Sequence, residues 1–330
     1  MKIYSKFVKA YTRDFSIIME EAWYYALAKG LWLKLGLSIP KDWPNFFRFN
    51  NNIIEVWENK KFINRIHNAI HTKKNNPVFF NNLLRQYKKL VAELKNNEMP
   101  NNLYISKLFD TISIFSIIWY GILDSRTEKR LKNKFVNVRD TDTIFDTNDK
   151  VVRKRILNKF PKFYGYETTL LSDELLGTPP SGVILKRRLN NFILVPGQFA
   201  DIIELNKFVK KFRIELELFT KPKNYLVKGL MANSGRATGK VRIIRMKKDV
   251  KNMKRGEILI SPMTTPDVFQ ALRKASAVVT DEGGALCHAA ILSRELNIPC
   301  IIGTKIASEL YKDGDMVEVD ANRGIVKIIK

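Results

Sequence analysis

The C-terminal part of this chain, from residue 226 onward, alternates short apolar runs with stretches of helical spacing. The two helical stretches are residues 267–275 and 289–296. Runs rich in β-branched residues and bounded by glycine or polar residues predict strands. They are Gly239-Lys-Val-Arg-Ile-Ile, Glu257-Ile-Leu-Ile, Ala277-Val-Val-Thr, Pro299-Cys-Ile-Ile, Met316-Val-Glu-Val and Gly324-Ile-Val-Lys-Ile-Ile. We therefore expect one compact domain over residues 226–330 that mixes sheet and helix.

Residues 1–225 have a different pattern and predict a mostly helical module. Apolar residues recur at three- and four-residue spacing over residues 15–29, 53–70, 79–94 and 200–219. The polar stretch 140–149 is expected to be a surface loop, and a basic helix is expected to follow it. A small β-hairpin is expected near residues 183–195, after a Gly-Thr-Pro-Pro-Ser-Gly turn. Pro222 marks the boundary between the two parts, so the chain as a whole is predicted to be α+β.

Composition favours a cytoplasmic protein with packed cores. Of the 330 residues 45% are apolar, and the two cysteines are too few for a disulfide framework. The N-terminus has no apolar stretch of the kind that a signal peptide carries. The most apolar segment, residues 111–123, is shorter than the ~20 residues that a membrane span needs. It is expected to be a buried helix, and no membrane association is expected.

The net charge of +24 raises the question of nucleic-acid binding. Most of the excess lies before residue 226. The chain is also rich in Lys, Asn and Ile together, as a strongly AT-biased genome produces, and it lacks the glycine–aromatic pattern of RNA-binding sheets. The sequence does not favour nucleic-acid binding as the main role.

One run within the C-terminal domain carries the chemistry. Thr280-Asp-Glu-Gly283-Gly284-Ala-Leu-Cys287-His288 leads from a predicted strand into a predicted helix. Two glycines free the backbone and remove side chains that would block a phosphoryl group. A histidine at a helix N-terminus is kept neutral and nucleophilic by the helix dipole, which also favours a phosphate placed on it.

The same run resembles the phosphohistidine signature of the PEP-utilising enzymes, a family that includes phosphoenolpyruvate synthase, pyruvate phosphate dikinase, rifampicin phosphotransferase and PTS enzyme I. The similar residues are Thr280-x-x-Gly-Gly-x-x-x-His-Ala-Ala-Ile-x-Ser-Arg-Glu-x-x-Ile-Pro299. The cysteine before the histidine is most similar to phosphoenolpyruvate synthase. Glycines at 229, 235, 239, 314 and 324 extend the resemblance over residues 226–330.

The resemblance implies a β/β/α domain that swivels between partner domains and carries phosphate on His288, by family analogy on Nε2. Thr280, Gly283, Gly284 and Arg294 are expected to bind the phosphoryl group, although Arg294 also fits an ion pair with an acid such as Glu295. Cys287 and Glu295 are expected to be accessory residues, and Cys287 fits a packing role equally well. No metal site is expected.

The chain departs from the family upstream of residue 226, where no glycine-rich phosphate loop of an ATP-grasp domain is found. No residues match an ATP or PEP site. We therefore expect that this chain itself binds no cofactor. ATP and magnesium are implied only through a separate ATP-grasp protein, and a separate PEP/pyruvate-binding protein is a further expected partner.

Two alternatives remain open. One is a non-catalytic or regulatory interaction module whose basic N-terminal part binds a partner or nucleic acid. The other concerns His67 and His71, which are four residues apart and share a helical face. Zinc needs a third and usually a fourth ligand, and no other Cys or His lies in that region, so metal binding there is not expected.

Overall fold

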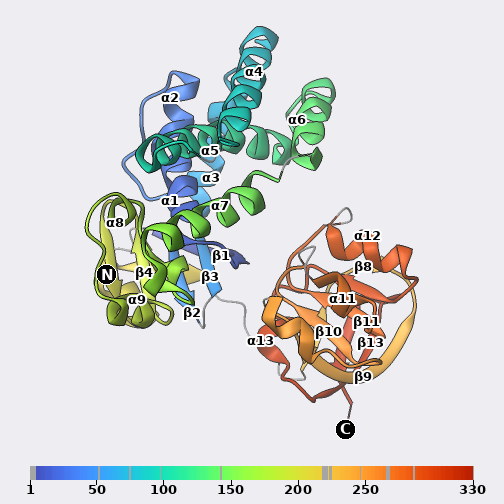
Figure 1. Cartoon of the computed structure of the whole chain (residues 1–330). Coiled ribbons are helices and arrows are strands. Elements are labelled where there is room, and N and C mark those ends of the chain that lie inside the picture. The colour runs from blue at the N-terminus through green and yellow to red at the C-terminus, as the bar shows by residue number, and fades with distance from the viewer. Residues whose placement is uncertain are drawn as a thin grey trace. The chain divides into compact units, whose positions relative to one another are not determined.

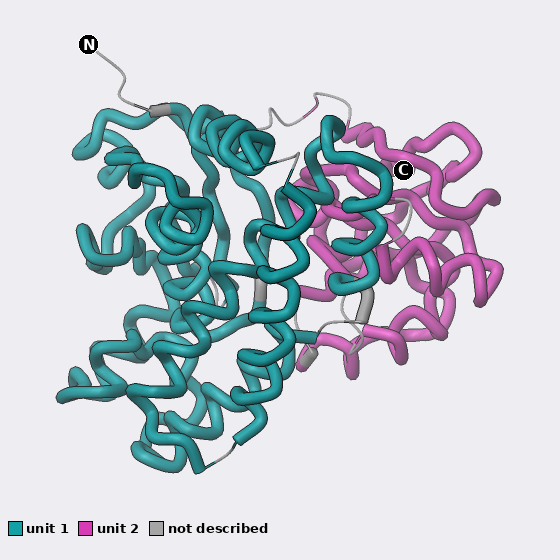
Figure 2. The backbone as a smooth tube through the Cα atoms, turned by 90° about the horizontal axis from the view of Figure 1, so that it is seen from above, with its two compact units in different colours: residues 1–217 teal, residues 218–330 magenta. Residues whose placement is uncertain are grey.

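The computed structural model describes residues 5–50, 53–73, 76–96, 98–141, 143–217, 222, 225–245, 247–264, 268–284 and 287–329. The chain divides into two compact units, residues 1–217 (unit 1) and 218–330 (unit 2), coloured separately in Figure 2. The sequence placed the boundary after residue 225, whereas unit 1 ends with the last strand of its own sheet. Both units combine helices with a sheet, so the α+β class is confirmed.

The sheet of unit 1 has six strands in the order β5-β4-β2-β3-β1-β6. Neighbouring strands are antiparallel except β1 and β6, which are parallel. The strands are β1 Ser5–Arg13, β2 Asn45–Asn50, β3 Ile53–Asn59, β4 Phe192–Val195, β5 Phe199–Ile202 and β6 Ile214–Glu217.

The helices of unit 1 pack around α5, the longest of those described (Figure 1). Fourteen of its residues are buried. By length and composition the helix could span a membrane, but 72% of its apolar 18-residue stretch is buried inside the protein. Burial of this kind is typical of a core helix. The α-helices are α1 Ile17–Tyr25, α2 Leu31–Leu35, α3 Lys60–His71, α4 Pro77–Glu93, α5 Asn101–Leu123, α6 Lys129–Thr141, α7 Ile144–Lys159, α8 Ser172–Leu176, α9 Gly182–Arg188 and α10 Leu205–Phe212; a π-helical turn, Ala26–Gly30, joins α1 to α2, and 3₁₀ turns lie at Pro161–Phe163 and Glu167–Thr169.

Two predictions for unit 1 are wrong because apolar residues in short runs fit helix and strand equally well. Residues 53–59 form a strand that is buried almost throughout, and the helix begins only at Lys60, capped by the Asn59 side chain. The hairpin expected near 183–195 is shifted. Val183 and Ile184 lie exposed in helix α9, and the hairpin is formed instead by β4 and β5.

Two further predictions for unit 1 are wrong for other reasons. The polar stretch 140–149 is not a loop, because α7 already begins at Ile144 and its polar side chains have buried partners. Asn148 Oδ1 accepts a hydrogen bond from Tyr104, and Asp149 Oδ1 accepts one from the Ser16 backbone N–H. The helix expected over 200–219 is interrupted, since only α10 is helical and strands β5 and β6 flank it.

Unit 2 contains an eight-stranded sheet in the order β7-β14-β13-β9-β10-β11-β12-β8. The central strands β9 to β12 are parallel to one another, and the remaining pairs are antiparallel. All six predicted strands are confirmed. The strands are β7 Leu226–Lys228, β8 Leu230–Asn233, β9 Arg236–Ile243, β10 Ile258–Ser261, β11 Ala277–Thr280, β12 Cys300–Ile302, β13 Met316–Asp320 and β14 Ile325–Ile328.

The helices of unit 2 are α11 Phe269–Leu272, α12 His288–Glu295 and α13 Ala307–Leu310, with a 3₁₀ segment at Lys247–Asn252. One core joins α11, α12 and the 3₁₀ segment to one face of β10, β11 and β12. The opposite face of these strands shares a second core with α13, β7, β13 and β14. The cores thus separate a helical layer, a central sheet layer and a second sheet layer, as the expected β/β/α arrangement requires.

Candidate functional site: the loops that surround His288

Three loops of unit 2 meet at one edge of the sheet. Strands β10, β11 and β12 are parallel, so the loops that follow Ser261, Thr280 and Ile302 leave from the same edge. Ligands of open parallel sheets bind at this edge. The Thr304 backbone N–H donates to the Thr280 carbonyl at 3.0 Å, and the Asp281 backbone N–H donates to the Ser261 carbonyl at 3.1 Å. The glycine–histidine run is therefore held from both sides.

His288 is the first residue of α12 and follows an extended N-cap residue, Cys287. The Cys287 backbone N–H donates to the Gly284 carbonyl at 2.9 Å, which ties the helix start to the glycine pair. The imidazole is half-buried, and its Nδ1 atom is buried with no hydrogen-bond partner in the described part of the chain. Burial lowers the pKa of His288 below 6.5, an effect that the charge of Glu295 partly opposes. The ring is therefore neutral at pH 7, as a nitrogen nucleophile must be.

The glycine pair lies exposed beside this helix start. Gly283 has a φ of 121°, a conformation that side-chain-bearing residues rarely adopt. A Cβ added to Gly283 would lie 2.8 Å from Cys287 Sγ, whereas one added to Gly284 would meet nothing within 4 Å. Residues 285 and 286 lie outside the described residues. The structure thus brings Gly283, Gly284, Cys287 and His288 together, as the sequence predicted.

Thr280 holds the loop in shape. Its side chain is 1% exposed, and its hydroxyl donates a 2.6 Å hydrogen bond to the Glu282 carbonyl. The single hydroxyl proton is therefore used within the protein, and Thr280 can offer a phosphoryl group no proton in this arrangement. Its expected contact with phosphate remains a prediction.

Arg294 and Glu295 lie at the other end of α12. Arg294 lies six positions after His288, which corresponds to about 9 Å along the axis of an α-helix. Arg294 Nε donates to the Ala232 carbonyl of strand β8 at 3.0 Å, so the side chain fastens α12 to the sheet edge. Its role as a phosphate ligand remains a prediction. Glu295 acts on the histidine through its charge, which raises the His288 pKa.

Sequence reasoning assigned no role to Asp281. Its carboxylate is 9% exposed and accepts hydrogen bonds from Thr304 Oγ1 at 2.9 Å and from the Ser308 backbone N–H at 3.2 Å. The Ser308 hydroxyl also donates to it. One feature of the sequence could have drawn attention to Asp281: it is a carboxylate directly after a buried strand and just before the glycine pair.

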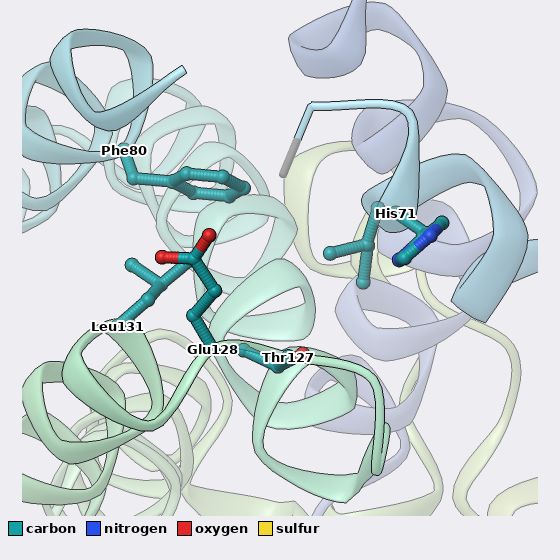
Figure 3. Close-up of a pocket in the computed structure, with 6 residues that line it drawn as sticks. His71, Phe80, Thr127, Glu128 and Leu131 are labelled. Atoms are coloured by element: carbon teal, nitrogen blue, oxygen red, sulfur yellow. The ribbon is translucent and has the colours of Figure 1, made fainter. Parts of the chain in front are cut away.

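The hollow between α3, α4 and α6 of unit 1 is a poor candidate for a second site. Figure 3 shows a small pocket between α3, α4 and α6, lined by His71, Phe80, Thr127, Glu128 and Leu131 together with Ile70. Its volume is about 10 Å³, the room of one water molecule at most. The Glu128 carboxylate extends toward Phe80 rather than toward His71 (Figure 3). Among the described residues, no three His, Cys, Asp or Glu side chains are placed to hold a metal ion.

Comparison with known proteins places residues 253–324 in the family described as PEP-utilising enzyme, mobile domain. The probable phosphoenolpyruvate synthase of Archaeoglobus fulgidus is 52% identical over 101 residues, which are 31% of this chain and 13% of that protein. The corresponding protein of Methanothermobacter thermautotrophicus is 49% identical over 110 residues, 33% of this chain and 16% of that protein. This chain therefore spans only a small part of the relatives that it matches.

Among solved structures, Thermococcus kodakaraensis aconitase X is similar at 23% identity and a TM-score of 0.26, with 32% of this chain and 98% of that chain covered. No inference about fold or function follows at that TM-score. The sequence match, by contrast, spans the glycine pair, Cys287, His288 and the whole of α12. Residues 253–324 of this chain therefore match the mobile-domain family of the PEP-utilising enzymes.

Proposed function

We propose that this chain carries a phosphoryl group on His288, as the mobile component of a system similar to phosphoenolpyruvate synthase or pyruvate phosphate dikinase. The observation that carries the proposal is the place of His288. It is the first residue of α12, beside an exposed glycine pair, inside the segment that matches the mobile domain. The depressed pKa of His288 supports the same role, because only neutral imidazole has a free lone pair.

The transfer itself is a displacement at phosphorus. The lone pair of His288 Nε2 attacks the phosphorus atom of the donor, and an N–P bond forms. The bond from phosphorus to the leaving oxygen breaks, and its electron pair departs with that oxygen. The proton of the neutral ring stays on Nδ1, which is the buried nitrogen. Transfer to an acceptor oxygen reverses these steps and regenerates neutral His288. Positioning and charge neutralisation supply most of the catalysis in such reactions.

The donor and acceptor sites belong, in this proposal, to separate proteins. An ATP-grasp partner would bind ATP and magnesium, and a PEP/pyruvate-binding partner would handle the other substrate. Such partners use ATP, so we place the protein in the cytoplasm.

The test uses the donor sites of a relative. A phosphoenolpyruvate synthase whose own carrier histidine has been replaced is mixed with this chain and given either ³²P-labelled ATP, with the label in the β or the γ position, or ³²P-labelled PEP. Acid-labile label on this chain is expected, and His288→Gln is expected to remove it. Label that persists in His288→Gln, or no label from any of these donors, contradicts the proposal.

A further inference from the structure

We propose that Asp281 is a positioning residue for phosphoryl transfer at His288, because its carboxylate fastens the loop after β12 to the loop that carries Gly283 and Gly284. This inference rests on the function proposed above. The side-chain hydrogen bonds of Asp281 go to Thr304 and Ser308, so we expect it to act through the glycine segment.

The side-chain hydrogen bonds of Asp281 lead to the segment after β12, to Thr304 in the loop and to Ser308 in the helix α13 that follows it. Thr304 Oγ1 donates to Oδ1 at 2.9 Å, and the Ser308 backbone N–H donates to Oδ1 at 3.2 Å and to Oδ2 at 3.3 Å. The Ser308 hydroxyl donates to Oδ2 as well. Thr304 and Ser308 are 4% and 3% exposed, so these bonds are shielded from water. Hydrogen bonds that are buried in this way are expensive to leave unmade.

The backbone of Asp281 continues the connection in both directions. Its N–H donates to the carbonyl of Ser261, the last residue of β10. Its carbonyl accepts a 2.9 Å hydrogen bond from the Lys305 N–H. The next residue, Glu282, donates its N–H to the Pro262 carbonyl at 2.9 Å. Asp281 is thus the point at which the loops after β10, β11 and β12 are joined.

The loop after β12 also passes close to the glycine segment itself. Gly303 has a φ of 71°, and a Cβ built on it would lie 3.6 Å from the Gly283 carbonyl oxygen. Gly283 in turn packs on Cys287, the residue that caps the helix of His288. Movement of residues 303–308 is therefore expected to displace the glycine segment relative to the histidine.

The expected role of Asp281 is geometric rather than electrostatic. The charged group that shifts the pKa of His288 is Glu295. A misplacement of about 1 Å can slow an enzymatic step by up to ~10²-fold. Loss of the Asp281 contacts should therefore slow phosphorylation while leaving the His288 pKa unchanged.

The chain offers a matched control at the opposite edge of the same sheet. Glu257 directly precedes β10, is 8% exposed, and accepts hydrogen bonds from Arg242 at 2.8 Å and 3.1 Å and from the Lys254 N–H at 2.8 Å. It is also a buried, hydrogen-bonded carboxylate, but it lies at the amino end of the strands. Its replacement should lower stability without touching the loops around His288.

The experiment compares the full-length wild type with Asp281→Ala, Asp281→Asn, Ser308→Ala and Glu257→Ala. The rate of His288 phosphorylation is measured with the labelled synthase system described above and with phosphoramidate, a small donor that needs no partner. Thermal unfolding by circular dichroism and the His288 pKa by NMR are recorded for each variant. Asp281→Ala is expected to be roughly 10- to 100-fold slower. Asp281→Asn should recover most of the rate, because its amide oxygen still accepts from Thr304 and the Ser308 N–H.

Glu257→Ala should keep the wild-type rate although its thermal stability falls. A wild-type rate in Asp281→Ala, an equal slowing in Glu257→Ala, or an Asp281→Asn variant as slow as Asp281→Ala would overturn the inference. The last result would indicate that the charge matters instead of the geometry. If the synthase system labels neither the wild type nor any variant, the proposed function fails. The rates measured with phosphoramidate then decide the role of Asp281 on their own.

Discussion

The sulfur atom of Cys287 occupies the space that a side chain on Gly283 would need. A Cβ on Gly283 would approach Cys287 Sγ to 2.8 Å, and the backbone of Gly283 is already in a left-handed region at φ 121°. Because Cys287 also caps α12, the glycine loop and the start of the histidine helix are fitted to each other. The glycine at 283 is therefore a requirement of the local structure.

We predict that Gly283→Ala combines backbone strain with this clash and lowers the free energy of unfolding by roughly 2–4 kcal/mol. Chemical unfolding followed by circular dichroism measures the change. Gly256→Ala is the matched control, since Gly256 has a φ of 84° but no atom within 4 Å of an added Cβ. It should cost only the strain, about 1–2 kcal/mol. Equal losses in the two variants would show that the contact with Cys287 has no energetic weight.

The pKa of His288 can be read by NMR, because the chain has only three histidines. Burial is expected to hold the midpoints of His67 and His288 below 6.5, and His288→Gln identifies the His288 signal by its loss. The decline of the phosphorylation rate on acidification should accordingly occur at lower pH than for a histidine of ordinary pKa. A midpoint above 6.5 for His288 would contradict the structure.

The same shift predicts how stability depends on pH. The folded pKa of His288 lies below its value in the unfolded chain, so the unfolded state binds more protons in the interval between them. The free energy of unfolding must therefore decrease as the pH falls through this interval. His288→Gln should lose less stability than the wild type between pH 7 and the folded pKa, as chemical unfolding at a series of pH values can measure.

Glu295 is the acidic residue whose charge raises the His288 pKa against the effect of burial. Glu295→Gln is therefore expected to lower that pKa further, with little change in stability because the side chain is exposed. The histidine NMR titration again measures the change. Glu318 of β13 forms an ion pair with Lys327. Glu318→Gln removes this acid and should leave the His288 titration unaffected. An unchanged pKa in Glu295→Gln would rule out the proposed charge interaction.

In unit 1, the turn at Gly30 and helix α5 pack too closely for a further methyl group. A Cβ on Gly30 would lie 2.6 Å from Ser113 Cβ and still closer to its hydroxyl oxygen. Gly30→Ala should destabilise unit 1 by about 1–3 kcal/mol. All five tryptophans lie before residue 120, so their fluorescence reports on this unit alone. In the background of Ser113→Gly the same change should cost much less, and additive losses would refute the contact.

The strands of unit 2 were predictable because each one is a short apolar run bounded by glycine, proline or a polar residue. Ala277–Thr280, for example, is buried on both faces and is followed at once by a turn. The position of His288 was predictable for a related reason, since a strong helix-forming segment begins directly after the glycine pair. The contacts of Asp281 were not, because Thr304 and Ser308, in the loop after β12 and in α13, lie more than 20 residues away in the sequence.

Unit 1 was predicted less well because its elements depend on tertiary partners. Ile53–Asn59 becomes a strand since β1 and β2 pair on either side of it, which no local spacing reveals. Asn148 and Asp149 stay helical although they are polar, because Tyr104 and Ser16 satisfy their side chains. In both cases distant residues decide between local conformations that the sequence leaves nearly equal.

The parallel strands at the centre of unit 2 also separate two edges of the sheet, at the carboxyl and the amino ends of the strands. These two edges differ in how well they should tolerate a chemical label. The loops around His288 lie at one edge, while Arg255, exposed in the turn before β10, lies at the other. A cysteine introduced at position 255 would therefore accept a fluorescent dye far from the glycine pair. Cys300 is buried and Cys287 adjoins the histidine, so selective labelling would require Cys287 to be replaced or shielded first.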